Sequence, residues 1–257
     1  MKKIGKVFGF LLVVAISLSI VVFGYKTYQQ KNYQQRLDSA KVTIKQESSR
    51  LNELNQAVNN LFTDDTADLL KPEVTTGEIE KLKTEIDGIK VSAKSYQLKA
   101  KDLPQATPEL INQQEDLLRL ISQAYDKATY QEKIIALYQE NQVNFQGVND
   151  QAVINWTLSP DAITNLLAKV NNLPEGNWKN IALGYLNMAQ DQYNQAMNTI
   201  DLINQLQQNG QLTPDANGEM FNQLLASLNN VTNANLADSL NQKVQEIQGQ
   251  LQAAGKV

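Results

Sequence analysis

Residues 7–24 form a run of apolar and small residues, VFGFLLVVAISLSIVVFG, without one charged side chain. A helix needs about 18 or more apolar residues to cross the hydrocarbon core of a membrane, whereas the apolar core of a cleaved signal peptide has about 7–15. Phe23 and Tyr25 lie where signal cleavage favours small side chains. The run therefore predicts an uncleaved transmembrane anchor, with a cleaved signal ending near Gly24, or a buried core helix, as alternatives. The predicted membrane-spanning side chains are Val7, Phe8, Phe10, Leu11, Leu12, Val13, Val14, Ile16, Leu18, Ile20, Val21, Val22 and Phe23.

Charges beside this run predict its orientation. Three lysines and the α-amino group lie in residues 1–6, and positively charged flanks stay in the cytoplasm. Tyr25 and Tyr28 follow the run, where aromatic side chains line a membrane interface. We therefore expect a cytoplasmic tail (1–6), an anchor (7–24) and an extracytoplasmic remainder. The predicted location is the cell membrane, crossed once, with the lipid bilayer as one partner.

The composition excludes several kinds of chemistry. The chain has no cysteine and no histidine, so it lacks disulfides, thiolate nucleophiles and the commonest general base and metal ligand. A net charge of −4 predicts no nucleic-acid partner. The chain holds 27 asparagines and 29 glutamines. Two explanations of this amide content stay open: a compositional bias of the lineage, or a surface that contacts wall glycans. We expect no cofactor, no metal and no enzymatic activity.

Residues 25–146 show the three-and-four spacing of apolar residues that is typical of coiled coils. One seam runs through residues 37–61, with Glu47 as its polar exception, and a second through residues 79–103. A third helix is expected from Thr107-Pro108 to about Phe145. Short connections favour antiparallel neighbours, so we predict a three-helix coiled-coil stalk. The principal seam residues are Leu37, Ile44, Leu51, Leu54, Val58, Leu61, Ile79, Leu82, Ile86 and Ile89.

Residues 147–257 carry fewer charges and predict a C-terminal helical bundle. A helix is expected after Ser159-Pro160, and a long one runs from about Trp178 to Gln208, where Asn209-Gly210 stops it. Two shorter apolar-periodic segments follow, around 220–228 and 237–251. The fold class is therefore all-α, in four segments: 1–6, 7–24, 25–146 and 147–257.

Part of this bundle resembles a tetratricopeptide repeat. Leu183-Gly184, Tyr193 and Ala196 have the spacing of that family, and Pro174 lies where a preceding repeat would end. Asn187 and Asp191 depart from the pattern, and the match covers about one and a half repeats, fewer than the three needed for a stable stack. The resemblance implies a peptide-binding groove, whereas an ordinary helical bundle is the fold that we favour.

These patterns predict a bacterial envelope protein that acts by binding. We expect a scaffold that contacts a protein partner of the cell envelope, most simply through residues 159–252, or a second copy through the stalk heptads. A secreted effector or adhesin released near Gly24 is the alternative, and an envelope hydrolase is a third class. Asp215, directly after Pro214, is expected to cap a helix and not to bind calcium.

Overall fold

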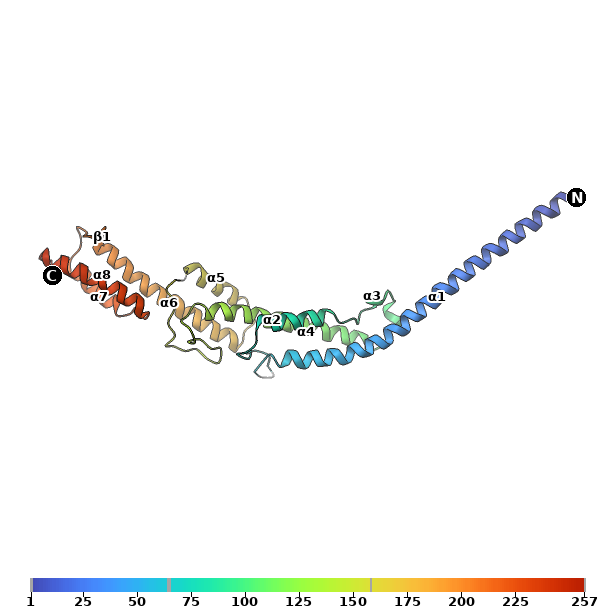
Figure 1. Cartoon of the computed structure of the whole chain (residues 1–257), viewed down its shortest axis with the longest axis horizontal. Coiled ribbons are helices and arrows are strands. Elements are labelled where there is room, and N and C mark those ends of the chain that lie inside the picture. The colour runs from blue at the N-terminus through green and yellow to red at the C-terminus, as the bar shows by residue number, and fades with distance from the viewer. Residues whose placement is uncertain (1, 64–65, 158, 257) are drawn as a thin grey trace. The chain divides into compact units, whose positions relative to one another are not determined.

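The computed structural model describes residues 2–63, 66–157 and 159–256, with side chains from residue 23 onward. The described chain is mostly helical, which confirms the predicted all-α fold class. Its packing groups into two units, one formed by residues 1–59 and 80–122, the other by 60–79 and 123–257. The elements, in chain order, are α1 (Lys2–Asn59), α2 (Thr76–Asp87), α3 (Ala93–Tyr96), the 3₁₀ turn η1 (Ala100–Asp102), α4 (Thr107–Ile135), α5 (Pro160–Asn171), α6 (Asn177–Leu206), β1 (Gln207–Gln208), β2 (Gln211–Leu212), α7 (Gly218–Leu228) and α8 (Ala234–Ala253) (Figure 1).

The prediction of a single-pass membrane protein is corrected. The side chains of residues 7–22 lie outside the described part, and Phe23, the last predicted spanning residue, is 76% exposed. Among the described residues, no helix has the length and the apolar character needed to cross a membrane. Beyond Phe23, α1 carries Lys26, Lys31 and Arg36 within three turns, and these charges interrupt the apolar character of that part of the helix. The predicted localisation, a single pass through the cell membrane with a cytoplasmic N-terminus, is therefore not supported.

The first unit is built from three passes of chain along the same axis. The hydroxyl of Tyr33 donates to Asp102, and Arg36 donates to the side chain of Gln97 at 3.1 Å. Residues 80–102 therefore run antiparallel to α1. After residue 102 the chain reverses, and α4 runs parallel to α1. The amide of Gln114 on α4 donates to the main-chain oxygens of Ile86 and Ile89, at 2.8 and 3.2 Å, and so fastens the end of α2.

The continuous helix predicted over residues 79–103 is wrong. The structure ends α2 at Asp87, and only short turns, α3 and η1, follow. Tertiary and capping hydrogen bonds explain the difference. The main-chain oxygens of Ile86 and Ile89, which a continuing helix would use, accept from Gln114 of α4. Ser92 then caps α3 by accepting from the main-chain nitrogen of Ser95 at 3.3 Å.

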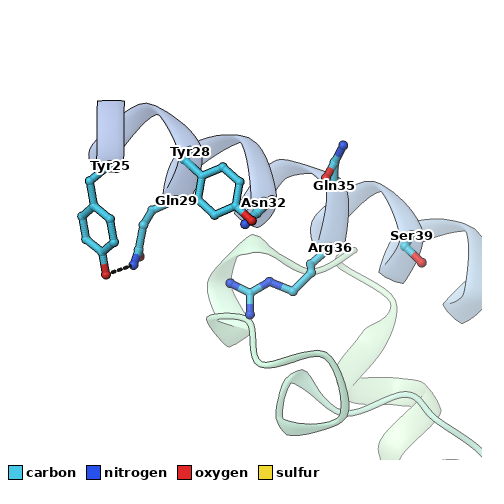
Figure 2. Close-up of a pocket in the computed structure, with 7 residues that line it drawn as sticks. All are labelled: Tyr25, Tyr28, Gln29, Asn32, Gln35, Arg36 and Ser39. Carbon is cyan, nitrogen blue, oxygen red and sulfur yellow. Dashed lines mark hydrogen bonds between the residues drawn. The ribbon is translucent and has the colours of Figure 1, made fainter. Parts of the chain in front are cut away.

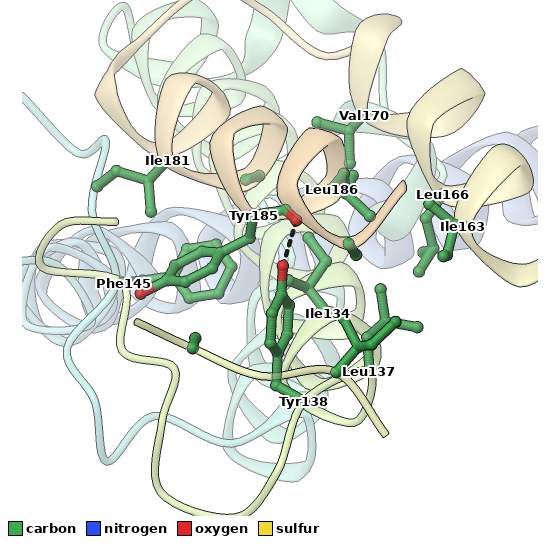
Figure 3. Close-up of a cluster of buried hydrophobic side chains, with 14 of the residues drawn as sticks. Ile134, Leu137, Tyr138, Phe145, Ile163, Leu166, Val170, Ile181, Tyr185 and Leu186 are labelled. Atoms are coloured by element: carbon green, nitrogen blue, oxygen red, sulfur yellow. Dashed lines mark hydrogen bonds between the residues drawn. The ribbon is translucent and has the colours of Figure 1, made fainter. Parts of the chain in front are cut away.

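One hydrophobic core of the second unit lies between the C-terminal part of α4, α5 and the first half of α6 (Figure 3). Tyr138 and Tyr185 meet edge to face with ring centroids 5.5 Å apart, and the Tyr138 hydroxyl donates to the main-chain oxygen of Tyr185. Trp178 is fully buried, and its ring stacks on Phe145 with centroids 5.4 Å apart. Burial raises the pKa of Tyr138, so this phenol stays protonated in the core.

A second core in the same unit joins the latter half of α6 to α7 and α8. The predicted stop at Asn209-Gly210 is a two-residue turn between β1 and β2, and both residues have positive φ angles, 52° and 79°. That conformation suits Asn-Gly in a tight hairpin. Helix α7 is capped by Asn217, whose side-chain oxygen accepts from Glu219 and Met220 at 3.0 Å. The predicted cap, Asp215, is therefore not the capping residue.

The carboxylate of Asp68 ties the loop before α2 to the N-terminus of α6. It accepts from the main-chain nitrogens of Asn177 and Trp178, the latter at 3.2 Å, and from the ammonium of Lys127 at 2.8 Å. Burial alone would raise the pKa of Asp68, but these hydrogen bonds outweigh it and hold the pKa below its usual value. The residue that would normally cap α6, Gly176, has no side chain, so Asp68 supplies the cap from a distant point in the sequence.

The helix lengths of the second unit do not fit a tetratricopeptide repeat. A 34-residue repeat contains two helices and their turn, whereas α6 alone has 30 residues. Gly184, which supplied part of the resemblance, has a local role: a Cβ there would lie 2.6 Å from a methyl of Val148. The glycine therefore lets the loop at 147–149 lie close against α6.

Candidate functional site

A hollow of about 350 Å³ lies between α1 and α4 in the first unit. Leu51 and Leu117 are buried at its base, and Leu120 beside them is half-buried. Exposed polar side chains surround these leucines. The hollow is lined by Leu51, Asn52, Asn55, Gln113, Asp116, Leu117, Arg119 and Leu120. We name it the α1–α4 groove.

The α1–α4 groove lies on the side of this helix pair that α2 leaves uncovered. Successive residues of a helix are rotated by about 100°. Gln114, which contacts α2, therefore lies about 60° to one side of Leu117, and Leu120 lies about 60° to the other side. Three passes of chain thus enclose one side of the α1–α4 pair, and the groove is open on the other.

The polar border of the groove is weakly charged. Arg119 and Asp116 form an ion pair at 3.1 Å, with 66% and 72% of their side chains exposed. Such exposed pairs contribute little to stability. The pair can therefore break at little cost, and each side chain can contact an incoming partner instead. Asn52, Asn55 and Gln113 add amide donors and acceptors. An apolar floor with a polar border is the usual composition of a protein interface.

The predicted seam residues are mostly buried but do not form one continuous seam. Leu37 and Leu82 are half-buried. Leu61 lies beyond the end of α1, where its main-chain oxygen accepts from Lys71 at 2.9 Å, and Ile89 lies beyond the end of α2. The buried members are Ile44, Leu51, Leu54, Val58, Leu61, Ile79, Ile86 and Ile89.

Glu47, the polar exception in the first seam, is held inside the first unit. Its side chain is 13% exposed and lies 3.8 Å from Arg50. One carboxylate oxygen of Glu47 is buried and makes no hydrogen bond within the described chain. Burial and the nearby charge of Glu47 together raise the pKa of Tyr96. Glu47 thus marks the level at which α3 meets α1.

A second hollow, of about 740 Å³, follows one side of α1 near residues 25–39 (Figure 2). Tyr25 and Tyr28, which were assigned to a membrane interface, are 62% and 65% exposed. The side-chain amide of Gln29 donates to the Tyr25 hydroxyl at 2.6 Å, and Arg36 donates to Gln97 at 3.1 Å. The hollow is shallow and open, and its groups form no catalytic arrangement.

Acidic side chains do not converge on a metal-binding geometry in the part of the chain that the structure describes. Asp68, whose pKa is displaced, is fully engaged in capping α6 and pairing with Lys127. None of these observations tests the expectation that the protein is not an enzyme, which stays a prediction.

Sequence reasoning did not identify the α1–α4 groove. The sequence predicted the contact surface in residues 159–252, and it predicted Leu51 only as a seam position. One signal was available: in the third predicted helix, Leu117, Ile121 and Ala124 have the three-and-four spacing of a seam, and Leu120 is a large apolar residue beside it. An apolar residue beside a seam widens the apolar stripe and indicates that the helix has an additional uncovered side.

Comparison with protein-family models, curated proteins and solved structures gave no match to this chain. The function is therefore argued from the geometry of the described residues.

Proposed function

We propose that this protein acts by binding a helical segment of another protein in the α1–α4 groove. The observation that carries the proposal is the open side of the α1–α4 pair, with Leu51, Leu117 and Leu120 at its base. In this proposal, α1, α2 and the part of α4 in the first unit form a helical stalk that displays the groove. An amphipathic helix that fills it would complete a four-helix arrangement.

The geometry favours a helix over an extended peptide as the occupant. An added strand needs a free sheet edge to supply main-chain hydrogen bonds, and the backbone groups of α1 and α4 at the groove are used within their helices. A helix instead contributes side chains at positions i, i+3, i+4 and i+7. Such a stripe matches the leucine floor, while the neutral amides at the border accept polar neighbours.

Photocrosslinking in the native host tests this proposal. A photoreactive residue replaces Gln113, which lines the groove, and in a control it replaces the adjacent Asn112, which is exposed and does not line it. We expect a discrete adduct from position 113 alone, joined to an apolar-periodic helical peptide of the partner. The substitutions Leu120→Asp and Asn55→Trp, both at residues that line the groove, should abolish the adduct from position 113, whereas Asn112→Trp should preserve it.

Two results contradict helix docking in the groove. One is the same adduct pattern from positions 112 and 113. The other is an adduct that survives both Leu120→Asp and Asn55→Trp while the variants keep their helical circular dichroism. An adduct between two copies of this chain would assign the groove to self-association, the alternative suggested by the heptads, and the mass of the purified protein in solution would then show a dimer.

A further inference from the structure

We propose that a cavity in the second unit binds a neutral oligosaccharide. This cavity is separate from the α1–α4 groove and has a volume of about 670 Å³, within the range of about 300–1,000 Å³ usual for ligand sites. Residues 139–140, residues 155–157 and the start of α8 form its walls. The lining residues are Gln139, Glu140, Asn155, Trp156, Thr157, Asn233, Asn235, Leu236 and Ser239.

Hydrogen bonds fix the three walls relative to one another. The main-chain nitrogen of Gln139 donates to Val153 at 2.9 Å. The Asn155 side chain donates to the main-chain oxygen of Tyr138 at 2.6 Å. The buried Asn233 donates to the main-chain oxygen of Ile154 at 2.8 Å and caps α8 by accepting from Leu236 at 3.0 Å. These bonds hold the three walls of this open cavity in place relative to one another.

An aromatic ring lines this cavity from a fixed position. Trp156 stacks on Tyr193 with ring centroids 5.5 Å apart and an interplanar angle of 22°. The indole is half-buried, so part of it is open to the cavity. The apolar C–H face of a sugar ring packs against such an aromatic surface, and the large, rigid ring loses little conformational entropy on contact.

The other lining groups match hydroxyl groups better than charged or apolar ligands. Gln139, Thr157, Asn235 and Ser239 provide neutral donors and acceptors, and Glu140 provides a carboxylate acceptor. The described lining contains no lysine or arginine, which an anionic ligand would favour. Its apolar contribution is limited to Trp156 and Leu236, too little for a lipid or another largely apolar ligand. Only one carboxylate lines the cavity, whereas glycoside hydrolysis usually needs two, so the proposal concerns binding and not cleavage.

Tryptophan fluorescence provides the test, because Trp156 is accessible to a quencher whereas Trp178 is fully buried. The full chain is titrated with maltotriose, cellotriose and chitotriose up to about 10 mM, which detects dissociation constants near 1 mM. We expect at least one trisaccharide to protect Trp156 from acrylamide quenching. Trp156→Ala should weaken binding, measured by calorimetry, about tenfold.

Matched asparagine variants keep the test independent of folding. Asn235 and Asn241 are both exposed on α8, but only Asn235 lines the cavity. Asn235→Ala should weaken trisaccharide binding about three- to tenfold, and Asn241→Ala should leave it unchanged. The proposal is overturned if none of the three sugars binds. It is also overturned if Asn235→Ala and Asn241→Ala bind the trisaccharide with the same dissociation constant. It is also overturned if a neutral blocked tetra-alanine peptide binds as tightly as the sugar and with the same dependence on Asn235.

Discussion

Replacing Asp68 with alanine should destabilise the second unit by about 3 kcal/mol. The carboxylate caps α6 through Asn177 and Trp178, and loss of a helix cap costs about 1 kcal/mol. It also pairs with Lys127 at 2.8 Å, where the two side chains are only 22% and 12% exposed. Breaking a fully buried pair costs about 3–5 kcal/mol. Partial exposure of Asp68 and the second bond from Lys127 to the Asp68 main chain reduce this to about 2 kcal/mol.

Thermal unfolding of the full chain measures this effect. For a unit of this size, 1 kcal/mol corresponds to about 2–4 °C in Tm, so Asp68→Ala should lower Tm by about 6–12 °C. Trp178 fluorescence is a suitable probe, because its buried ring follows directly on the helix end that Asp68 caps. In the double variant with Lys127→Met, the added cost should be smaller than the sum of the single costs, since the ammonium is then no longer left unpaired.

Gly176 provides a geometric control for the same carboxylate. A Cβ at position 176 would lie 2.7 Å from a carboxylate oxygen of Asp68. Gly176→Ala should therefore displace the carboxylate and destabilise the wild-type chain, but it should cost little in a chain that already carries Asp68→Ala. Equal costs in both backgrounds, or a Tm of Asp68→Ala within about 1 °C of the wild type, would refute the reasoning.

The contribution of Asp68 should also depend on pH. Its folded-state pKa lies below the unfolded value of about 3.9. The unfolded chain therefore takes up the proton first as the pH falls, and protonation favours unfolding. The stability difference between wild type and Asp68→Ala should be constant above about pH 5, and it should shrink as the pH falls below about 4 towards the folded pKa.

Three further substitutions test buried polar contacts of the second unit, each by urea unfolding. Lys179→Met should cost about 1–3 kcal/mol, because the buried ammonium donates to two main-chain oxygens at the end of α5, at 2.8 and 2.9 Å. Tyr185→Phe should cost a similar amount, since its hydroxyl accepts from the main chain at Asn149 and donates at Gly147, both at 2.9 Å. Ser227→Ala should cost only about 1 kcal/mol, because Thr199 keeps a second hydrogen bond within α6.

Helices with local start and stop signals could be predicted from the sequence. The start of α4 at Thr107-Pro108, the start of α5 after Ser159 and the end of α6 before Asn209-Gly210 all follow from residues at those points. Residues 88–102 could not be predicted in this way. Their apolar spacing is helical, but Gln114 of α4 takes the main-chain oxygens of Ile86 and Ile89, a contact that forms only after the helices pack.

The two candidate sites were harder to predict, for a related reason. The α1–α4 groove exists because α2 covers only one side of a helix pair, and the relative placement of three helices is not encoded in any local pattern. The sugar-binding cavity is formed by residues 139–157, a segment without regular periodicity, and by the start of α8, more than 70 positions further along the chain. No spacing in the sequence connects Trp156 to Asn235.

Asn233 in the second unit has a structural role for which an amide is suited, and one substitution tests it. Asn233 is 7% exposed and uses both ends of its amide, donating to Ile154 and accepting from Leu236. Aspartate caps helices as well as asparagine does, yet it cannot donate to the Ile154 oxygen at neutral pH. If donation is what the fold requires, Asn233→Asp should cost about 1–3 kcal/mol in urea unfolding at pH 7. An aspartate variant as stable as the wild type would show that capping alone matters, and the walls of the cavity would then not depend on the amide.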